Sequence, residues 1–317
     1  MRILITESLA PEAVRLLRAC HQVDVRDGYH GEQLCDIIAD YDALIVRSQT
    51  QVGREVLRHA ARLRLIARAG SGVDNIDVAE AERRGILVIN TPGANAIAVA
   101  EHTIGLMLAL ARHIPRADAS VRAGEWRRAE FEGVELFGKT LGIVGFGCIG
   151  AEVAQRALAL GMTVIATDPF VAPERASAMG VPLVSPETLL ARADFISIHV
   201  PANPSTHHLI GRRELALVKP GCRIINCARG EVLDEDALAD ALAEGRVAGA
   251  ALDVFEREPP ANRRLLADRR VILTPHIGGS TAEARARVGV EVAREVLRVL
   301  GGQAPMRLAS APQRAMA

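Results

Sequence analysis

One glycine-rich stretch limits the folds open to this chain of 317 residues. The apolar run Leu141–Val144 leads into glycines spaced Gly-x-Gly-x-x-Gly, and a helical pattern of small and apolar residues begins directly after them. A second short apolar run, Thr163–Thr167, ends at Asp168. A strand, a glycine turn, a helix and an acidic residue in this order predict a βαβ unit that binds a dinucleotide.

Each glycine of the pattern has its own physical task. Gly145 permits the tight turn, Gly147 lets the backbone approach a pyrophosphate, and Gly150 lets the helix pack closely on the sheet. Free N–H groups at the helix start would hold the pyrophosphate. Asp168 would accept hydrogen bonds from ribose hydroxyls and repel a 2′-phosphate, and no arginine follows it directly, so the sequence favours NAD over NADP. The alternative is a glycine-rich turn in another α/β protein.

Composition excludes several classes of protein. Lys+Arg and Asp+Glu balance at 38 each, so no overall field attracts nucleic acid or an anionic membrane. The five cysteines are an odd number without CxxC pairing, which argues against a disulfide framework or a zinc site and fits a reducing cytoplasm. The sequence opens on a strand pattern and contains no apolar run of about eighteen residues, so we expect a cytoplasmic protein without signal peptide or membrane span.

Strands and helices alternate on both sides of the glycine pattern, which predicts α/β architecture with two doubly wound parallel sheets. In the first part of the chain the expected strands are Ile3–Ile5, Val23–Val25, Ala43–Val46, Leu65–Ala67 and Leu87–Ile89. After Thr163–Thr167 they are Phe195–His199, Arg223–Asn226, Gly249–Leu252 and Val271–Leu273. In open sheets of this class, the loops that follow the strands carry the ligands.

Two segments suggest where the chain passes between domains. Thr91–Asn95 breaks the alternation, and a long helix, apolar nearly all round, follows from Ile97 to about Arg112 and continues in some form to Gly124. Such a helix must be buried on more than one side. We expect residues 1–95 and 282–317 to form a substrate-binding (catalytic) domain, with residues 96–281 inserted as an NAD-binding domain. The tail 301–317 has no periodic pattern and is expected to be partly disordered.

Three strand-end motifs after the glycine pattern each offer one reactive side chain, namely Arg229, Glu258 and His276. Hydride transfer at a carbonyl or hydroxyl carbon requires a group that gives or takes a proton, and an imidazole, with an ordinary pKa of about 6.5, does both. A neighbouring carboxylate orients the imidazole and favours its charged form. A guanidinium can anchor a substrate carboxylate at two points. The alternatives are a core histidine and a structural Arg–Glu pair.

Several motifs then indicate a family. The segments Val-Arg47-Ser, Arg68-Ala-Gly-Ser-Gly-Val-Asp-Asn-Ile-Asp, Asn-Cys-Ala-Arg229-Gly and Pro275-His276-Ile-Gly-Gly-Ser-Thr resemble the D-isomer-specific 2-hydroxyacid dehydrogenases, and the likeness extends over about residues 1–305. The resemblance implies a Rossmann-type NAD domain inserted in a flavodoxin-like substrate domain, a homodimer or dimer of dimers, and a small 2-hydroxy or 2-keto acid as substrate. Within the family it favours NAD-dependent oxidation of 3-phospho-D-glycerate.

The resemblance also assigns roles to individual residues. Arg229 would bind the substrate and act in catalysis, with Glu258 as the partner of His276 and His276 as the acid/base. The implied cofactor contacts are Gly145, Gly147, Cys148, Ile149, Gly150, Asp168, Cys227, Ala228, Asp253, Gly278 and Thr103. The implied substrate contacts are Arg47, Arg68, Ser71 and Gly72.

The sequence departs from the family pattern in places. Cys148 stands at a fingerprint position often occupied by arginine, and the basic stretch after Trp126 is diluted. The sequence also shows no serine-sensing regulatory domain after the second sheet, so we expect no feedback through one. The first two departures keep a reductase for an unphosphorylated keto acid, such as hydroxypyruvate or glyoxylate, as an alternative. An NAD-sensing protein without enzymatic activity is a lesser alternative, because all three reactive side chains are present.

Other polar residues have simpler interpretations. His102 lies in the apolar helix and is a rival acid/base, although a packed position or one beside the nicotinamide is favoured. His207 and His208 follow a proline-containing turn and are expected on the surface. No base adjoins Cys227 in the sequence, so a backbone contact is expected there rather than a nucleophile.

Overall fold

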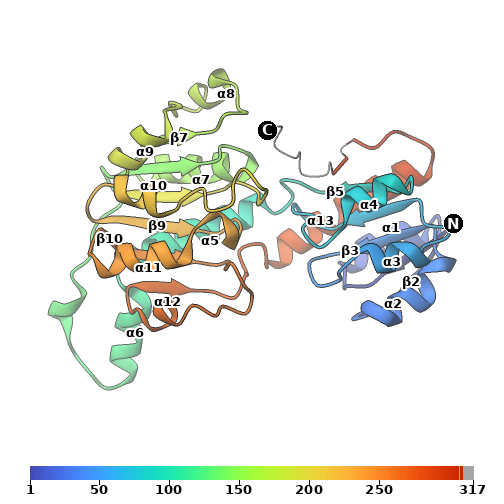
Figure 1. Ribbon diagram of the computed structural model, residues 1–317, viewed down its shortest axis with the longest axis horizontal. Helices are drawn as coiled ribbons and strands as arrows, with labels where there is room; N and C mark the ends of the chain where they lie inside the picture. Colours follow the sequence, from blue (N-terminus) through green and yellow to red (C-terminus); the bar gives the residue numbers. More distant parts are fainter. Residues whose placement is uncertain (307, 310–317) are drawn as a thin grey trace. The chain divides into compact units, whose positions relative to one another are not determined.

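Two parallel β-sheets organise the protein, which we describe from a computed structural model; the described residues are 1–306, 308 and 309. The chain forms two compact units. Unit 1 comprises Met1–Asn95 and the described residues from Gly279 onward, and unit 2 comprises Ala96–Gly278. Each is a sheet covered by helices (Figure 1), so the expectation of two parallel-sheet α/β domains is confirmed.

Unit 1 contains a five-stranded sheet in the order β2-β1-β3-β4-β5, with every neighbouring pair parallel. This strand order is the doubly wound order of flavodoxin-like folds. The elements of unit 1 are β1 (Arg2–Ile5), α1 (Pro11–Arg18), β2 (Gln22–Val25), α2 (Gly31–Ile37), η1 (Ile38–Asp40), β3 (Ala43–Val46), α3 (Arg54–His59), β4 (Leu65–Arg68), α4 (Val78–Arg83), β5 (Leu87–Asn90) and α13 (Ala282–Leu300).

Helices cover both faces of this sheet because its strands are apolar on both sides. On one face Leu17 of α1 and Val292 of α13 pack with Ile5 in one buried cluster. On the other face Leu34 of α2 and Leu57 of α3 pack with β-strand side chains in a second cluster. The long amphipathic helix α13 thus completes the core of unit 1 (Figure 1).

Unit 2 contains a six-stranded parallel sheet in the order β11-β10-β9-β8-β6-β7. The chain runs from β6 to β7 on one side and then crosses to β8 on the other, which makes the carboxyl end of β6 a topological switch point. The elements of unit 2 are α5 (Ala96–Ala111), α6 (Ile114–Arg122), η2 (Arg128–Phe131), β6 (Thr140–Val144), α7 (Cys148–Ala159), β7 (Thr163–Thr167), α8 (Pro173–Ser177), α9 (Pro186–Arg192), β8 (Phe195–Ile198), α10 (Arg212–Leu217), β9 (Cys222–Asn226), η3 (Gly230–Val232), α11 (Glu235–Ala243), β10 (Val247–Leu252), α12 (Arg263–Ala267) and β11 (Val271–Leu273).

The core of unit 2 lies on both faces of its sheet. Met107 of α5 and Val153 of α7 belong to one buried cluster with Ile143 of β6. Leu189 of α9 and Leu238 of α11 belong to a second cluster on the other face. Both clusters consist of residues of unit 2, so this unit has a hydrophobic core of its own.

The apolar helix expected from Ile97 to about Arg112 corresponds to α5, and the continuation expected in some form to Gly124 is a separate helix, α6. α5 ends at Ala111, His113 is left-handed with φ of 55°, and α6 begins at Ile114. Pro115 explains the break, since its ring would clash with the carbonyl of Ala111 in a continuous helix. Among the described residues no single helix is long and apolar enough to cross a membrane; α5 and α6 meet that criterion only as a pair bent by 62°. The disorder expected for the tail concerns mainly residues outside the described set.

Candidate active site

The three predicted catalytic side chains follow neighbouring strands of unit 2. In the sheet register Asn226 of β9 lies beside Leu252 of β10, and Leu252 lies beside Leu273 of β11. Arg229 and His276 follow the outer two of these strand ends, and the segment with Glu258 follows the middle one. The fold therefore brings all three residues to the carboxyl edge of one sheet.

His276 and Glu258 form a direct pair. The Nδ1 atom of His276 lies 2.9 Å from Oε2 and 3.1 Å from Oε1 of Glu258. Both side chains are nearly half exposed, at 47% and 42%, so a ligand can reach them. His276 has a φ of 54°, which a non-glycine residue adopts only where the surroundings hold it. Its N–H donates to the carbonyls of Asp253 (2.8 Å) and Thr274 (3.0 Å) and fixes this backbone.

Asp253 holds the loop that carries His276. Its carboxylate accepts hydrogen bonds from the hydroxyl of Thr274 (2.6 Å) and from the N–H groups of Ile277 (2.9 Å) and Gly278 (2.7 Å). His102 of α5 lies 3.4 Å away through Nε2. Burial would raise the pKa of Asp253, but the bonds from His102, Thr274 and the two N–H groups outweigh it and lower the pKa. The resemblance gave Asp253 a cofactor contact, and the structure shows in addition a loop-fixing role for it that sequence reasoning missed. The Thr-Pro-His motif was the available signal.

Arg229 is positioned by the turn after β9. The side chain of Asn226 spans this turn. Its Nδ2 donates to the backbone carbonyl of Arg229 (2.8 Å), and its Oδ1 accepts a hydrogen bond from the N–H of Ala228 (3.0 Å). Nη1 of Arg229 donates to the carbonyl of Ala228 (2.7 Å). The sequence drew attention to Arg229 but not to Asn226, which is 1% exposed and forms the rigid support of this turn.

The glycine pattern adopts the geometry that a dinucleotide turn requires. Gly145 has a φ of 94°, and a Cβ there would lie 2.8 Å from the carbonyl of His199. A Cβ on Gly150 would overlap the carbonyl oxygen of Gly145, so α7 packs against the turn as expected. A Cβ on Gly147 would meet nothing within 4 Å, which leaves open space for a ligand beside the backbone. These features fit a bound pyrophosphate at the start of α7.

Asp168 closes the fingerprint from the end of β7. Its two carboxylate oxygens accept hydrogen bonds from the N–H groups of Phe146 and Phe170, each at 2.8 Å. A carboxylate oxygen has more than one acceptor site, so these bonds fix its orientation and leave capacity for ribose hydroxyls. Cys148 at the first position of α7 is exposed, and Ile149 packs partly against the core.

Two of the implied cofactor residues are buried in the core. The hydroxyl of Thr103 donates to the carbonyl of Val99 (2.8 Å), and Thr103 is fully buried. Burial is the main cause that raises the pKa of the Cys227 thiol to about 12, partly offset by a hydrogen bond with Thr103. The thiol is therefore protonated at neutral pH and is not an activated nucleophile.

The implied substrate residues lie at the carboxyl edge of the unit 1 sheet. Arg47 follows β3, and burial together with the charge of Arg285 lowers its pKa. Arg68 ends β4, and its guanidinium occupies the space that a Cβ on Gly70 would need. The hydroxyl of Ser71 donates to Asn95 (2.8 Å). Gly72 follows in the same loop and is partly exposed.

The other three histidines that the sequence analysis considered, His102, His207 and His208, each contact a neighbouring side chain. Nε2 of His102 lies 3.2 Å from the Thr274 hydroxyl, so His102 adjoins the candidate active site without pairing with Glu258. His208, expected on the surface, has a side chain that is 35% exposed and pairs with Glu256 at 3.0 Å. His207 stacks on it with ring centroids 4.1 Å apart.

Comparison with known proteins bears on this site. Residues 104–278 match the family described as D-isomer specific 2-hydroxyacid dehydrogenase, NAD binding domain. The chain is 49% identical over 313 residues to a protein of Methanocaldococcus jannaschii named D-3-phosphoglycerate dehydrogenase, covering 98% of this chain and 60% of that protein. The chain thus spans a little over half the length of the curated relatives that it matches.

Solved structures resemble the chain over nearly its full length. A glyoxylate reductase from Paecilomyes thermophila matches with a TM-score of 0.89 and 34% identity over 97% of each chain. A D-lactate dehydrogenase from Aquifex aeolicus, complexed with NAD and lactic acid, matches with a TM-score of 0.84 and 30% identity, covering 95% of this chain and 96% of that one. These matches extend the family likeness through both units.

Proposed function

Because the chain belongs to the D-isomer-specific 2-hydroxyacid dehydrogenase family, we propose that it uses NAD to oxidise 3-phospho-D-glycerate to 3-phosphooxypyruvate, a step that leads to serine. The observation that carries the dehydrogenase chemistry is the His276–Glu258 pair, 2.9 Å apart at the carboxyl edge of the unit 2 sheet. The phosphorylated substrate is supported by relatives 46–49% identical over 95–98% of the chain, whose name is D-3-phosphoglycerate dehydrogenase.

The chain's own residues perform the proton chemistry in this proposal. Bound NAD would supply the acceptor for the hydride that leaves the hydroxyl-bearing carbon. His276 takes the hydroxyl proton at Nε2, because Nδ1 faces Glu258. Glu258 holds the ring in place and stabilises the imidazolium that forms. The guanidinium of Arg229 binds the substrate carboxylate and polarises the reacting carbon.

Unit 2 is the proposed NAD-binding domain, and the family match at 104–278 lies within it. Gly145, Gly147 and Gly150 admit the pyrophosphate, with Cys148 and Ile149 at the start of α7. Asp168 binds the ribose. The remaining proposed contacts to the nicotinamide half are Thr103, Cys227, Ala228, Asp253 and Gly278. Because Thr103 and Cys227 are buried, we propose that their backbone atoms contact the cofactor and that their side chains shape the site.

Unit 1 is the proposed substrate-binding domain. Arg47 is the group best suited to a phosphate, because burial and a neighbouring arginine make its charge costly in the absence of an anion. Arg68, Ser71 and Gly72 lie in the next strand-end loop and supply a second cation, a hydroxyl and backbone N–H groups.

A substrate panel tests the proposal. Purified protein is mixed with NAD or NADP and with phosphorylated or plain D-2-hydroxy acids, and nicotinamide absorbance is followed in both directions. We expect turnover of 3-phospho-D-glycerate with NAD and a much lower kcat/KM with NADP. Efficient turnover of hydroxypyruvate or glyoxylate without activity on the phosphorylated acid would refute the substrate assignment. It would support the second candidate, a keto acid reductase, which the full-length likeness to a glyoxylate reductase favours.

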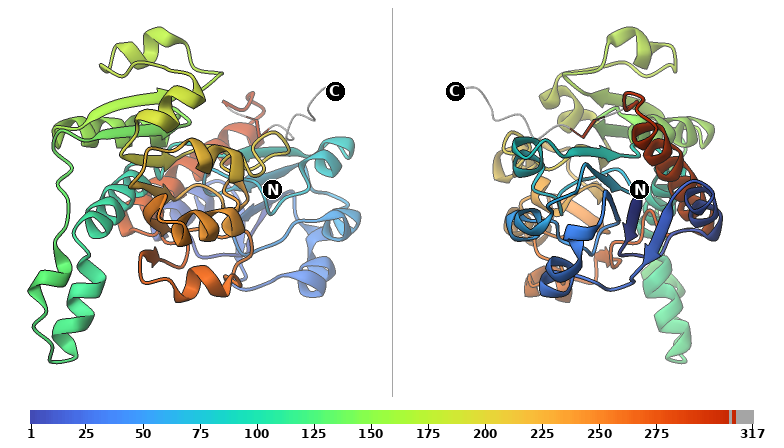
Figure 2. Two further views of the ribbon diagram at one scale, coloured as in Figure 1. Left: turned by 60° about the vertical axis from the view of Figure 1, so that its left-hand side comes forward. Right: turned by 90° about the vertical axis from the view of Figure 1, so that its right-hand side faces the viewer.

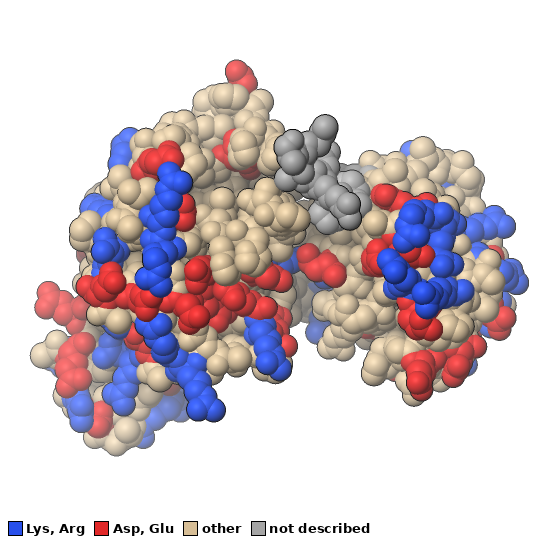
Figure 3. Space-filling view, viewed as in Figure 1, with Lys and Arg blue, Asp and Glu red and all other residues tan. Residues whose placement is uncertain are grey.

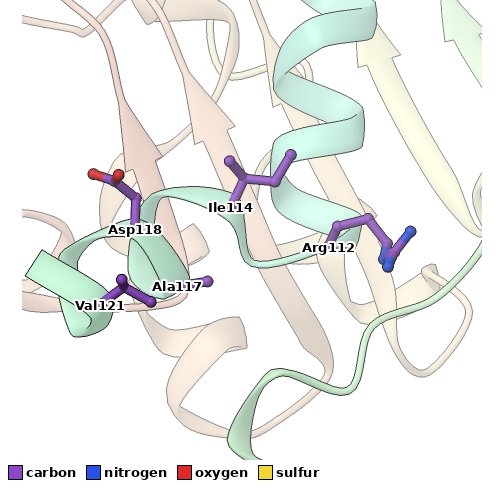
Figure 4. A pocket seen from close by; sticks show the side chains of 5 residues that line it. All are labelled: Arg112, Ile114, Ala117, Asp118 and Val121. Carbon is purple, nitrogen blue, oxygen red and sulfur yellow. The ribbon is translucent and has the colours of Figure 1, made fainter. Parts of the chain in front are cut away.

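We also propose a homodimer built through α6. Figure 2 shows α6 and the segment after it extending away from the sheet of unit 2. An open pocket of about 540 Å³ lies there, lined by Arg112, Ile114, Ala117, Asp118 and Val121 (Figure 4). Ile114, Val121 and Trp126 are 52%, 56% and 77% exposed, an apolar surface of the kind that a partner covers.

Light scattering tests the proposed homodimer. It should give twice the chain mass for the wild type and the single mass for Val121→Asp; a monomeric wild type would contradict this proposal.

The proposed location is the cytoplasm. All five cysteines are free thiols, and Cys20 and Cys148 are exposed. Exposed thiols persist in a reducing compartment, where disulfides are rare.

A further inference from the structure

A second hydrogen-bonded network lies next to the Glu258–His276 pair, and none of its members has a role in the proposed function. The N–H of Glu235 donates to Oε1 of Glu256 (3.1 Å), and the N–H of Glu256 donates to Oε1 of Glu235 (2.9 Å). Nε2 of His208 lies 3.0 Å from the same Glu256 oxygen. Acidic side chains form a band across this face of unit 2, where α11 lies (Figure 3).

The network joins three segments that are far apart in the sequence. Glu235 is the first residue of α11, His208 lies in the loop before α10, and Glu256 follows β10. His208 has a φ of 49°, held by a hydrogen bond from its N–H to the carbonyl of Glu231 (2.7 Å). A left-handed non-glycine residue persists where its surroundings over-determine it. The arrangement is therefore a rigid anchor rather than a chance surface contact.

One of the two carboxylates, that of Glu235, is buried, whereas the Glu256 side chain is 36% exposed. Glu235 is 8% exposed, and burial is the main cause that raises its pKa. A buried carboxylate is costly unless it is paired or hydrogen-bonded. Here the N–H of Glu256 satisfies Glu235, the start of α11 favours negative charge, and the imidazole of His208 adjoins the second carboxylate.

The anchored segment bears on two of the proposed catalytic residues. A Cβ on Gly230 would overlap the carbonyl of Phe255 and the N atom of Glu256, so the segment after β10 lies directly on the residue next to Arg229. Phe255 is buried, and its N–H donates to Oε1 of Glu258 (3.3 Å). The chain from Phe255 to Glu258 is thus fixed at one end by Gly230 and by the carboxylate network.

We propose that Glu256 and Glu235 are positioning residues, which hold the segment 254–258 against Gly230 so that the Glu258 carboxylate meets His276. This inference rests on the proposed role of His276. Neither residue touches the substrate or the cofactor in this proposal. Loss of the network lets the segment shift, and a displacement of about 1 Å at a catalytic pair can lower the rate about a hundredfold.

Three variants separate positioning from general stability. Glu256→Ala removes the oxygen that both Glu235 and His208 contact. Glu256→Gln keeps an oxygen acceptor at the same place and loses only the charge. Glu244→Ala, at the other end of α11, removes an exposed carboxylate whose partner is Arg246 at 3.3 Å and serves as the matched control.

We expect Glu256→Ala to lower kcat about tenfold to a hundredfold, with the NAD Kd measured by calorimetry unchanged. Glu256→Gln should recover kcat to within about threefold of the wild type, and Glu244→Ala should match the wild type. Equal losses in the alanine and glutamine variants, or a wild-type kcat in Glu256→Ala, would overturn the inference.

A double-mutant cycle with Glu258→Gln tests whether the effect passes through Glu258. If Glu256 acts by placing that carboxylate, adding Glu256→Ala to Glu258→Gln should cause little further loss in kcat. Full additivity of the two losses would contradict the inference. Should Glu256→Ala fail to fold, Glu256→Asp replaces it, since its shorter side chain cannot reach the Glu235 N–H, and the same outcomes apply.

Hydrogen exchange of the protein without ligand gives a readout independent of turnover. The peptide that covers 253–258 should exchange faster in Glu256→Ala than in the wild type, and at the wild-type rate in Glu256→Gln and Glu244→Ala. Unchanged exchange in Glu256→Ala would refute anchoring through the Glu256 carboxylate, because this variant keeps the bond from the N–H of residue 256 to Glu235. A wild-type protein that oxidises no D-2-hydroxy acid would refute the proposed function instead, and the exchange data would still decide whether the network holds the segment.

Discussion

At the scale of single residues, the candidate active site depends on a few side chains whose loops are fixed by hydrogen bonds. His276 is left-handed, and its N–H is fixed by two carbonyls. The carboxylate of Asp253 fixes the same loop by accepting hydrogen bonds from two N–H groups and one hydroxyl group. The imidazole is therefore placed before any ligand arrives, which reduces the ordering cost at the moment of reaction.

The first prediction concerns His276. Replacement by alanine should lower kcat by about two to four orders of magnitude, the usual contribution of a general acid/base. NAD affinity, measured by calorimetry, should stay near the wild-type value because the glycine turn is elsewhere in unit 2. Near-normal turnover by this variant would remove the imidazole from the mechanism.

The second prediction concerns pH and His199. Its Nε2 lies 2.8 Å from the hydroxyl of Ser197, its Nδ1 is buried without a partner among the described residues, and burial lowers its pKa to about 3. The unfolded chain, with an ordinary pKa of about 6.5, binds a proton that the folded protein does not. Stability is therefore fully present above about pH 6.5 and falls towards acid, by at most about 1.4 kcal/mol per pH unit from this group.

Urea unfolding at a series of pH values measures this effect. The variant His199→Gln should lose less stability than the wild type between about pH 6.5 and pH 4.5. Both proteins share the other acid-sensitive groups, including Asp253, so the difference isolates His199. Parallel stability curves would show that this imidazole does not resist protonation.

At the scale of elements, the glycine turn and α7 act as one piece. A Cβ on Gly150 would overlap the carbonyl oxygen of Gly145, whereas a Cβ on Gly147 would meet nothing within 4 Å. Gly150 therefore serves the packing of α7 against the turn, and Gly147 serves the approach of a ligand. Substitutions at these two positions of one motif should therefore have different effects on stability and on NAD affinity.

Alanine substitutions distinguish these two roles. Gly150→Ala should lower both stability, by about 1–3 kcal/mol, and NAD affinity, because α7 must move away from the turn. Gly147→Ala should leave the urea midpoint near the wild-type value and weaken NAD binding, since the methyl group occupies the ligand's space. Equal stability losses in the two variants would contradict this division.

Sequence patterns were sufficient for the strands and for the position of the glycine turn. Apolar runs between turn signals match β3 (Ala43–Val46), β7 (Thr163–Thr167) and β11 (Val271–Leu273). For β3 the reason is that a parallel strand buried on both faces reads as a continuous apolar run. The continuation expected in some form from about Arg112 to Gly124 is the separate helix α6, and Pro115 accounts for the break at His113.

The supports of the candidate site were beyond sequence patterns. Glu258 and His276 were paired only through the resemblance, and the structure shows their contact. Asn226, Thr274 and Glu256 act through hydrogen bonds to residues that are distant in the chain or set by loop conformation. Neither periodicity nor spacing encodes such bonds.

At the scale of the whole molecule, the chain is built as one unit placed within the sequence of another. Unit 2 is continuous from Ala96 to Gly278, and unit 1 is completed by the segment that begins at Gly279. Helix α13 packs with α1 on the unit 1 sheet, so the first 95 residues alone lack part of their core.

Fragment studies test this organisation. A fragment of residues 96–278 should unfold cooperatively and bind NAD, since both of its core clusters lie within it. A fragment of residues 1–95 should be unstable by itself, because the apolar side of α1 loses Val292 and Val296 of α13. Circular dichroism during heating and calorimetry with NAD provide the measurements. An unfolded 96–278 fragment would contradict the independence of unit 2.

The absence of a side chain at Gly230 has a consequence for how this protein can vary. The main chain of Phe255 and Glu256 fills the volume that any other amino acid would need there, and backbone atoms cannot rotate out of the way. In a library of random substitutions selected for growth, position 230 should be among the least permissive sites, although its residue offers no chemistry of its own. Related sequences that differ at other positions should therefore keep glycine at position 230.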